Sequence, residues 1–159
     1  MKTKLFLASL VALLCFTNVS FSQDYHSEYS IGYSAGIGDW AIDRVNFQTI
    51  QGIKVNDNFT AGIGVGLDYY FDSESLMLPL TINAKAYLPT SAKFAPFASL
   101  DLGYGIGVSE SVSGFTITPA VGIKAGKFMA QIGYNSQKLS ESGVSLNMGA
   151  IQLKVGIAF

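Results

Sequence analysis

The sequence predicts an all-β fold, an eight-stranded antiparallel up-and-down transmembrane β-barrel, on three observations. Along most of the chain, large apolar residues alternate with small or polar ones, and a period of two is typical of strands with two unlike faces. The chain is 49% hydrophobic but only 13% charged, whereas ordinary soluble domains contain about 25% charged residues. After the N-terminus, no apolar run approaches the roughly 20 residues of a membrane-spanning helix.

The closing stretch, residues 151–159, shows the pattern most clearly. Large apolar residues occupy every second position, from Ile151 to Phe159, and small or polar residues lie between them. Such a last strand is expected in a membrane barrel, where it pairs with the first strand and leaves no open edge. For this stretch alone, a buried strand of a soluble sandwich is the alternative.

The first residues predict a cleaved secretory signal peptide. Two lysines precede an apolar segment over residues 5–16, and Ser20 and Ser22 fit the small-x-small pattern of a cleavage site. We therefore expect a signal peptide over residues 1–22 and one β-barrel domain over residues 23–159. The single cysteine, Cys15, lies in the segment expected to be removed, so no disulfide and no cysteine metal site is expected.

The alternation predicts eight strands joined by two kinds of connection. The strands are expected at about residues 28–38, 46–55, 59–71, 76–88, 94–108, 115–125, 128–136 and 145–159. Most reach the roughly 9–11 residues that a tilted membrane strand needs. The connections after the second, fourth and sixth strands are predicted as short turns, and the others as polar and mostly longer loops. Bacterial barrels show this asymmetry between short periplasmic turns and longer external loops.

The large apolar residues are expected to face outward, because the interior of an eight-stranded barrel is just wide enough for side chains to fill it. Several large residues from each strand would not fit there, whereas the residues of the opposite parity, many of them among the 17 glycines, would. The inverted arrangement, with apolar residues inside, is that of a soluble ligand-binding barrel. It would leave an outer surface of mostly Gly, Ser and Thr, which is poor for solubility.

Aromatic residues gather at the ends of the predicted strands. Aromatic girdles are expected at the two membrane interfaces of such a barrel, although aromatic residues are also common in strands generally. The predicted girdle residues are Phe59, Phe94, Phe128 and Phe159 at the expected periplasmic rim, and Tyr69, Phe71, Tyr104, Phe115 and Tyr134 at the opposite rim.

Three prolines, Pro79, Pro96 and Pro119, fall within predicted strands. Proline has no backbone N–H to donate to the ladder. Pro79 and Pro96 are expected near strand ends, where they are tolerated. Pro119 is expected nearer the middle of its strand and predicts a bulge or a locally broken ladder.

The opposite parity predicts a polar barrel interior. A charge on the lipid side would cost about 2–4 kcal/mol at the bilayer midplane, so interior placement is expected whatever the function. A packed, paired polar core that fills the lumen is the favoured interpretation, and a narrow selective pore lined by lysines is the alternative. The predicted lumen-lining residues are Lys54, Asp68, Asn83, Lys85, Asp101, Lys124, Gln131, Gln152 and Lys154.

With these patterns, the chain resembles the small outer-membrane β-barrel family of Gram-negative bacteria, the OmpA/OmpX-like and porin-like group, and looks most like its short Bacteroidota members. The resemblance is carried by the signal peptide, the segments GIGVGLDYYF (62–71), LPLTINAKAYL (78–88) and FASLDLGYGIG (97–107), and the terminal Phe159. It implies a bacterial outer-membrane location, a shell of outer-membrane lipid and insertion by the outer-membrane assembly machinery, which reads the C-terminal strand.

Little in the sequence suggests catalysis, a cofactor or a metal. Barrel enzymes commonly need a His with a Ser or Asp near the external rim. The single histidine, His26, precedes the first predicted strand and is expected to be solvated on the periplasmic side. We see no paired carboxylates, no metal-ligand cluster and no phosphate-binding loop. The net charge of -1 gives no basic patch, so nucleic acid is not an expected partner.

The sequence therefore predicts an integral outer-membrane β-barrel protein with a structural or surface role and a side-chain-filled lumen. A small low-conductance porin for ions or small solutes is the alternative, and a soluble lipocalin-like carrier is a third possibility. The predicted external loops are too short for a large receptor surface, and their partner is left open. They carry Trp40, Asp43, Arg44, Asp72, Glu74, Glu110, Lys138 and Glu141.

Overall fold

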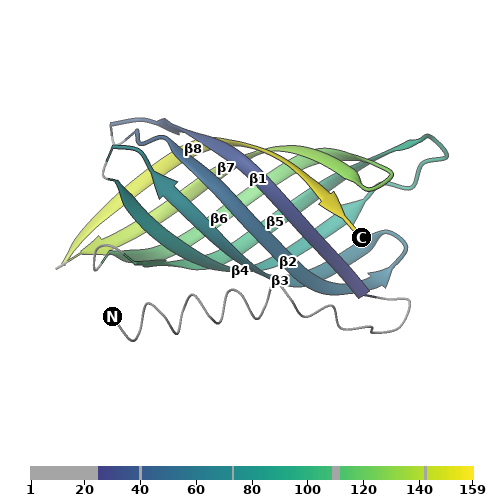
Figure 1. The fold of residues 1–159 in the computed structure, drawn as a ribbon, viewed down its shortest axis with the longest axis horizontal. Coiled ribbons are helices and arrows are strands. Elements are labelled where there is room, and N and C mark those ends of the chain that lie inside the picture. The colour runs from purple at the N-terminus through teal and green to yellow at the C-terminus, as the bar shows by residue number, and fades with distance from the viewer. Residues whose placement is uncertain (1–24, 40, 73, 109–111, 142) are drawn as a thin grey trace.

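Eight antiparallel strands form one closed barrel, in which each strand pairs with its neighbours in sequence and β1 pairs with β8 (Figure 1). The computed structural model describes residues 25–39, 41–72, 74–108, 112–141 and 143–159. The predicted fold class, an eight-stranded antiparallel up-and-down barrel, is confirmed. The predicted signal peptide and Cys15 lie outside the described residues.

Among the described residues, no helix is long and apolar enough to span a membrane.

The strands follow the predicted ranges closely in the middle of the chain and depart from them at several ends. They are β1 (Tyr25–Ile37), β2 (Arg44–Asn56), β3 (Phe59–Tyr70), β4 (Ser75–Tyr87), β5 (Phe94–Gly107), β6 (Ser113–Ala125), β7 (Phe128–Glu141) and β8 (Val144–Ala158). The largest difference is at β7, which was expected to end at residue 136. Lys138, expected in an external loop, therefore lies within a strand and is exposed.

The barrel closes through a continuous ladder between β1 and β8. The pairing runs from Glu28 opposite Ala158 to Ile37 opposite Gly149. Beyond the strand ends, Phe159 N donates a hydrogen bond to Ser27 O at 2.8 Å, and Ser27 N donates to Phe159 O at 3.1 Å. Closure leaves no unpaired sheet edge, so every strand can satisfy its backbone polar groups without water.

The connections do not divide into short and long as cleanly as predicted. At the end where β1 begins and β8 ends, they are residues 57–58, 88–93 and 126–127. At the opposite end they are residues 38–43, 71–74, 108–112 and 142–143. The prediction of a short turn after β4 and of a longer loop after β7 is wrong. Connection length alone therefore gives only a weak indication of which end faces outward.

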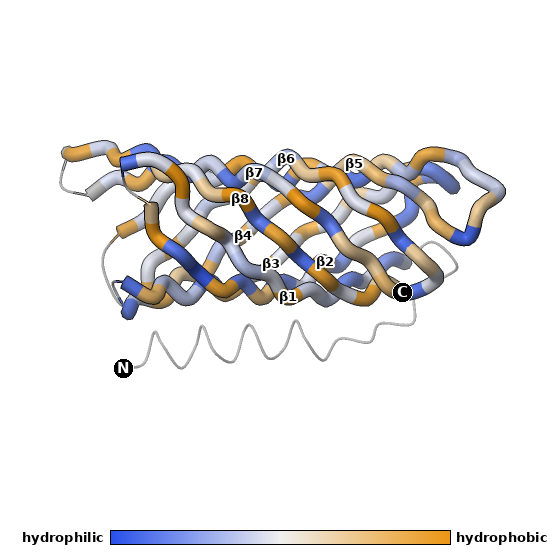
Figure 2. Tube along the Cα trace, turned by 90° about the horizontal axis from the view of Figure 1, so that it is seen from above, coloured by the Kyte–Doolittle hydropathy of each residue, from blue (hydrophilic) through white to orange (hydrophobic). Residues whose placement is uncertain are grey.

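The outer surface of the barrel is apolar and the interior is mostly polar. In β4, Ile82 is 67% exposed, while Asn83 next to it is 2% exposed. The same alternation of hydropathy runs along the tilted strands in Figure 2. In the described part of the chain, this polar interior fits a lipocalin-like carrier poorly, whereas an exposed apolar belt of this extent fits contact with hydrocarbon.

The nine predicted girdle residues are all exposed on the outer surface. Phe59, Phe94 and Phe128 begin β3, β5 and β7, and Phe159 follows β8, so these four lie at one end of the barrel. Tyr69, Phe71, Tyr104 and Phe115 lie toward the opposite end, where Tyr104 pairs with Phe115 across the β5–β6 ladder. Tyr134 was expected at that rim but lies at the middle of β7, because this strand continues to Glu141.

Backbone pairing is interrupted at two of the three prolines. The β6–β7 ladder skips residues 118–119 and resumes in the same register, which confirms the locally broken ladder expected at Pro119. The β3–β4 ladder skips residues 78–79 in the same way, at Pro79. Pro96 near the start of β5 remains paired with β6. Each interruption affects only one of the two ladders that the strand makes, so the barrel stays closed.

Candidate functional site

The barrel interior is the candidate functional site, because strand parity directs most of the polar side chains toward the barrel axis. The nine predicted lumen residues differ in their exposure. Asn83, Lys85, Asp101, Gln131, Gln152 and Lys154 are buried, Asp68 and Lys124 are half-buried, and Lys54 is exposed near the end of β2. Among the described residues, no group of three or more His, Cys, Asp or Glu side chains could hold a metal ion.

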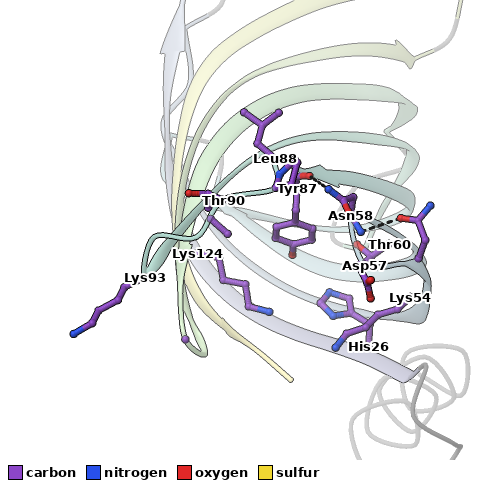
Figure 3. A pocket seen from close by; sticks show the side chains of 14 residues that line it. His26, Lys54, Asp57, Asn58, Thr60, Tyr87, Leu88, Thr90, Lys93 and Lys124 are labelled. Atoms are coloured by element: carbon purple, nitrogen blue, oxygen red, sulfur yellow. Dashed lines mark hydrogen bonds between the residues drawn. The ribbon is translucent and has the colours of Figure 1, made fainter.

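A chamber of about 500 Å³ occupies the end of the interior where β1 begins (Figure 3). His26, Thr60, Tyr87 and Lys124 line its walls, and connection 88–93 forms part of its rim. Midway along the barrel lies a cavity of only about 30 Å³, which is room for a water molecule or two. Within the described residues, the interior therefore has a chamber at the end where β1 begins and little free space near its centre.

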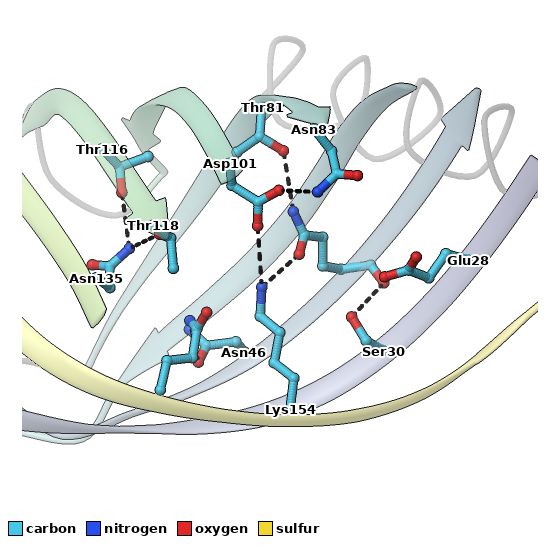
Figure 4. A network of polar contacts seen from close by, with 12 residues as sticks. Glu28, Ser30, Asn46, Thr81, Asn83, Asp101, Thr116, Thr118, Asn135 and Lys154 are labelled. Carbon is cyan, nitrogen blue, oxygen red and sulfur yellow. Dashed lines mark hydrogen bonds and ion pairs between the residues drawn. The ribbon is translucent and has the colours of Figure 1, made fainter. Parts of the chain in front are cut away.

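Lys154 on β8 reaches across the centre of the lumen (Figure 4). Its Nζ donates a hydrogen bond to Gln48 Oε1 on β2 at 2.6 Å and lies 3.7 Å from Asp101 Oδ2 on β5. Asn83 Nδ2 donates to Asp101 Oδ1 at 2.5 Å, and Gln48 Nε2 donates to Thr81 Oγ1 at 3.1 Å. Since β8 is adjacent only to β1 and β7, the Lys154 contacts bridge the lumen instead of following the wall.

A second buried ion pair joins β1 to β4. Lys85 Nζ donates to Glu28 Oε2 at 2.6 Å, and the two side chains are 1% and 3% exposed. Lys85 Nζ also lies 4.6 Å from the centre of the Phe97 ring. His26 Nε2 is 3.4 Å from the same Glu28 oxygen. The expectation that His26 precedes the first strand and is solvated is wrong, because β1 begins at Tyr25 and directs His26 into the barrel.

Arg44 belongs to this interior network, although it was expected in an external loop. It is the first residue of β2 and is buried. Its Nη2 donates a hydrogen bond to Asn135 Oδ1 on β7, its Nε lies 3.7 Å from Asp68 Oδ2, and its guanidinium carbon lies 5.2 Å from the Tyr70 ring centre. The sequence signal was its parity, since Arg44 lies two positions before the inward-facing Asn46.

The interior also contains two apolar clusters that the expectation of a polar lumen missed. One consists of Tyr70, Met77, Leu139 and Met148, with Ile42 and Val112 packed against it. The other consists of Phe97, Met129 and Ala158, with Tyr87 packed against it. These residues occupy inward-facing positions of their strands, so the alternation by itself predicts that they point into the barrel. Their hydrophobicity predicts the opposite, because large apolar residues were expected on the lipid face. They narrow the lumen on both sides of the central network.

Of the other residues predicted for the external loops, Asp43 is hydrogen-bonded to β1, whereas Asp72 and Glu74 are exposed. Asp43 accepts hydrogen bonds from Tyr33 Oη at 2.5 Å and from Gly36 N at 3.0 Å. These two hydrogen bonds lower the pKa of Asp43 below its ordinary value. Asp72 and Glu74 are exposed in connection 71–74. Trp40, Glu110 and the side chain of Glu141 lie outside the described residues.

The fold of this chain, a closed eight-stranded barrel with an apolar outside and an ion-paired inside, is shared by solved structures of small outer-membrane β-barrels. Neisserial surface protein A has a TM-score of 0.60 at 11% identity, covering 84% of this chain and 95% of that one. The outer membrane enzyme PagL has a TM-score of 0.65 at 12% identity, covering 82% and 98%.

The N-terminal β-barrel domain of Pseudomonas aeruginosa OprF is similar to a lesser degree, with a TM-score of 0.53 at 15% identity over 84% of this chain and 97% of that one. Comparison of the sequence with protein-family models and with curated proteins finds no match. At such low identities the likeness shows the fold alone. The resemblance to small outer-membrane barrels therefore holds at the level of fold, and the Bacteroidota type stays a prediction.

Proposed function

We propose that the chain is an integral protein of the bacterial outer membrane with a structural or surface role, and that its own side chains close its lumen. The observation that carries this proposal is the cross-lumen network around Lys154, which joins β8 to β2 and β5 at the centre of the barrel. An ion or solute that crossed there would have to separate buried, hydrogen-bonded charges. Breaking a buried ion pair by removing one partner typically costs about 3–5 kcal/mol.

The proposed location rests on the outer surface of the barrel and on the fold that it shares with known proteins. The exposed apolar belt fits lipid, and two structural neighbours are a neisserial surface protein and an outer membrane enzyme. We also propose insertion by the outer-membrane assembly machinery, through the C-terminal strand. Because one fold hosts several roles, the role itself has to be argued from the interior.

We propose that the chain is not an enzyme. Its single histidine, His26, is buried beside Glu28 at the end of the barrel where β1 begins. The orientation expected from the sequence makes this the periplasmic end, whereas barrel enzymes commonly have catalytic groups near the external rim. Among the described residues, neither ring nitrogen of His26 has a hydrogen-bond partner, so no serine is held in place as a nucleophile beside it.

A small low-conductance porin is the second candidate, because the chamber at one end carries lysines that would attract anions. Recordings from planar bilayers separate the two functions. We expect the wild-type protein to give no reproducible conductance steps. The double variant Asp101→Ala/Lys154→Ala should give measurable steps, because it removes both charges of the central pair and leaves neither of them unpaired.

The matched control is Asp72→Ala/Lys138→Ala, which removes the same two charges from exposed positions and should stay closed. Steady, charge-selective steps from the wild-type protein that disappear in Lys85→Ala would contradict the structural role and favour the porin.

A further inference from the structure

The chamber at the end where β1 begins carries more positive charge than its carboxylates can neutralise. Its lining includes Lys54, Lys93 and Lys124 and a single carboxylate, Asp57. Among the described residues, no carboxylate lies within 4.0 Å of any of the three lysines. The nearby Glu28 is already paired with Lys85 at 2.6 Å. The chamber is therefore a concave, partly desolvated site with excess positive charge, which favours an anion.

The chamber also contains buried polar atoms without partners. In the described part of the chain, Thr60 Oγ1, Tyr87 Oη and His26 Nδ1 have no hydrogen-bond partner, and His26 Nε2 has only the 3.4 Å contact with Glu28 Oε2. His26 is 1% exposed and Thr60 is 4% exposed. Buried polar groups are normally paired, because leaving them unpaired is unfavourable. The hydroxyl groups and the imidazole can each donate to an oxygen acceptor, so the unpartnered atoms indicate a ligand rich in acceptors.

Several of these lysine, tyrosine and histidine side chains point into the chamber itself. Figure 3 shows Lys124 and the Tyr87 ring pointing into the chamber, with His26 on the facing wall, whereas Lys93 points away. Lys124 Nζ lies 5.6 Å from the centre of the Tyr87 ring, so one ligand group could contact both. These groups come from β1, β4 and β6, and the closed barrel fixes their relative positions.

We propose that this chamber binds a phosphoryl anion, with Lys54 and Lys124 supplying charge and Thr60, Tyr87 and His26 donating hydrogen bonds. A phosphoryl group has several strong acceptor oxygens and no need of an acceptor from the protein, which suits this set of donors. The volume of about 500 Å³ leaves room for more than the phosphate itself. The group could belong to free phosphate, to a soluble phosphate ester or to a phospholipid headgroup.

Two binding experiments distinguish these sources. For soluble anions, inorganic phosphate and glycerol 3-phosphate are titrated calorimetrically into the purified protein in an uncharged detergent and a phosphate-free buffer. For lipid, native mass spectrometry compares retention of phosphatidylglycerol with that of diacylglycerol of the same chain length. Saturable binding of either soluble anion supports a soluble ligand, and selective retention of phosphatidylglycerol supports a headgroup. Each result supports the proposal.

Two single variants, Lys124→Gln and Lys93→Gln, form a matched pair. Both remove one positive charge at the same end of the barrel, but only Lys124 points into the chamber. Lys124→Gln should weaken binding roughly tenfold or more, because it removes a charge-assisted contact. Lys93→Gln should weaken binding by less than about threefold, the effect of a distant, screened charge.

Tyr87→Phe separates ligand binding from a structural role. It keeps the ring that packs beside Lys124 and removes only a hydroxyl that has no partner within the described residues. Binding should weaken several-fold, while the midpoint of unfolding without ligand stays the same or rises. The proposal is overturned if the wild-type protein binds neither the soluble anions nor phosphatidylglycerol selectively, or if Lys124→Gln and Lys93→Gln bind equally well.

Discussion

Among the described residues, buried ionic side chains pair with an opposite charge on another strand, and the Glu28–Lys85 pair shows what such a partner does. The side chains paired in this way are Glu28, Arg44, Lys85, Asp101 and Lys154. Lys85→Met should destabilise the barrel by about 3–5 kcal/mol, because Glu28 stays buried without its closest cation. The double variant Glu28→Gln/Lys85→Met should recover much of that loss, because it leaves no unpaired charge. Unfolding by urea in detergent, arranged as a double-mutant cycle, measures both effects.

Lys93→Met, at an exposed position, is the control and should change the free energy of unfolding by less than about 0.5 kcal/mol. Equal destabilisation in Lys85→Met and in the double variant would show that the packing of the lysine matters and the charge does not.

Parity indicated several buried positions from the sequence, and it gave no such indication at strand ends. Lys85 and Lys154 lie in long alternating segments, so their side of the sheet followed from their neighbours. His26 and Arg44 lie at the start of β1 and β2, where few neighbours define the alternation. The inward direction of Tyr70 was hidden for another reason, because its bulk suggested lipid. Which charges pair across the lumen depends on distances in the folded barrel. The alternation of residues along one strand gives no information about those distances.

At the scale of single elements, connection 38–43 is held to the barrel by Asp43. The hydrogen bond from Tyr33, and then that from Gly36 N, lower the pKa of Asp43 below its ordinary value of 3.8. A lowered folded-state pKa contributes stability that is present above the ordinary value and is lost as the pH falls through the folded value. We therefore expect this connection to stay ordered from neutral pH to about pH 4 and to loosen only below it.

An NMR titration of the Gly36 amide measures this transition. Tyr33→Phe removes the larger of the two causes, so its midpoint should move up toward the ordinary value. A wild-type midpoint at or above that value, or one that Tyr33→Phe does not change, would contradict the role of this hydrogen bond.

The elements themselves were predictable wherever the bilayer imposes alternation. β3 and β4 were predicted almost to their ends, since every outward position there is apolar. The extension of β7 to Glu141 was missed, because its outward positions Lys138 and Ser140 are polar. Where a strand extends beyond the lipid, its backbone hydrogen bonds still hold it to its neighbours, and its side chains need not be apolar. Periodicity of hydropathy therefore marks the membrane-facing part of a strand better than the whole strand.

At the scale of the whole molecule, one lysine substitution on the apolar face can test whether that face contacts lipid. Ile63 in β3 is 66% exposed on the outer surface. Ile63→Lys should destabilise the barrel in phospholipid vesicles by about 2–4 kcal/mol if it meets hydrocarbon near the midplane. Val144→Lys, at a position that is 61% exposed at the start of β8, should cost only about 0–1 kcal/mol near the interface.

Unfolding free energies in vesicles compare the two variants directly. Small and equal effects would show that both positions face water, which would remove the basis for a membrane location. The outward direction of Ile63 followed from the sequence alone, because an eight-stranded ring has too little internal volume for its large residues.

The ladder between β1 and β8 joins the first and last strands along the chain, and this has a consequence for biogenesis. Until β8 has been made, β1 and the most recently synthesised strand each present an open row of backbone donors and acceptors, which is a template for aggregation. The polypeptide can protect neither row by itself. Only the complete ring has both rows paired, so an incomplete chain is expected to aggregate unless another molecule covers them.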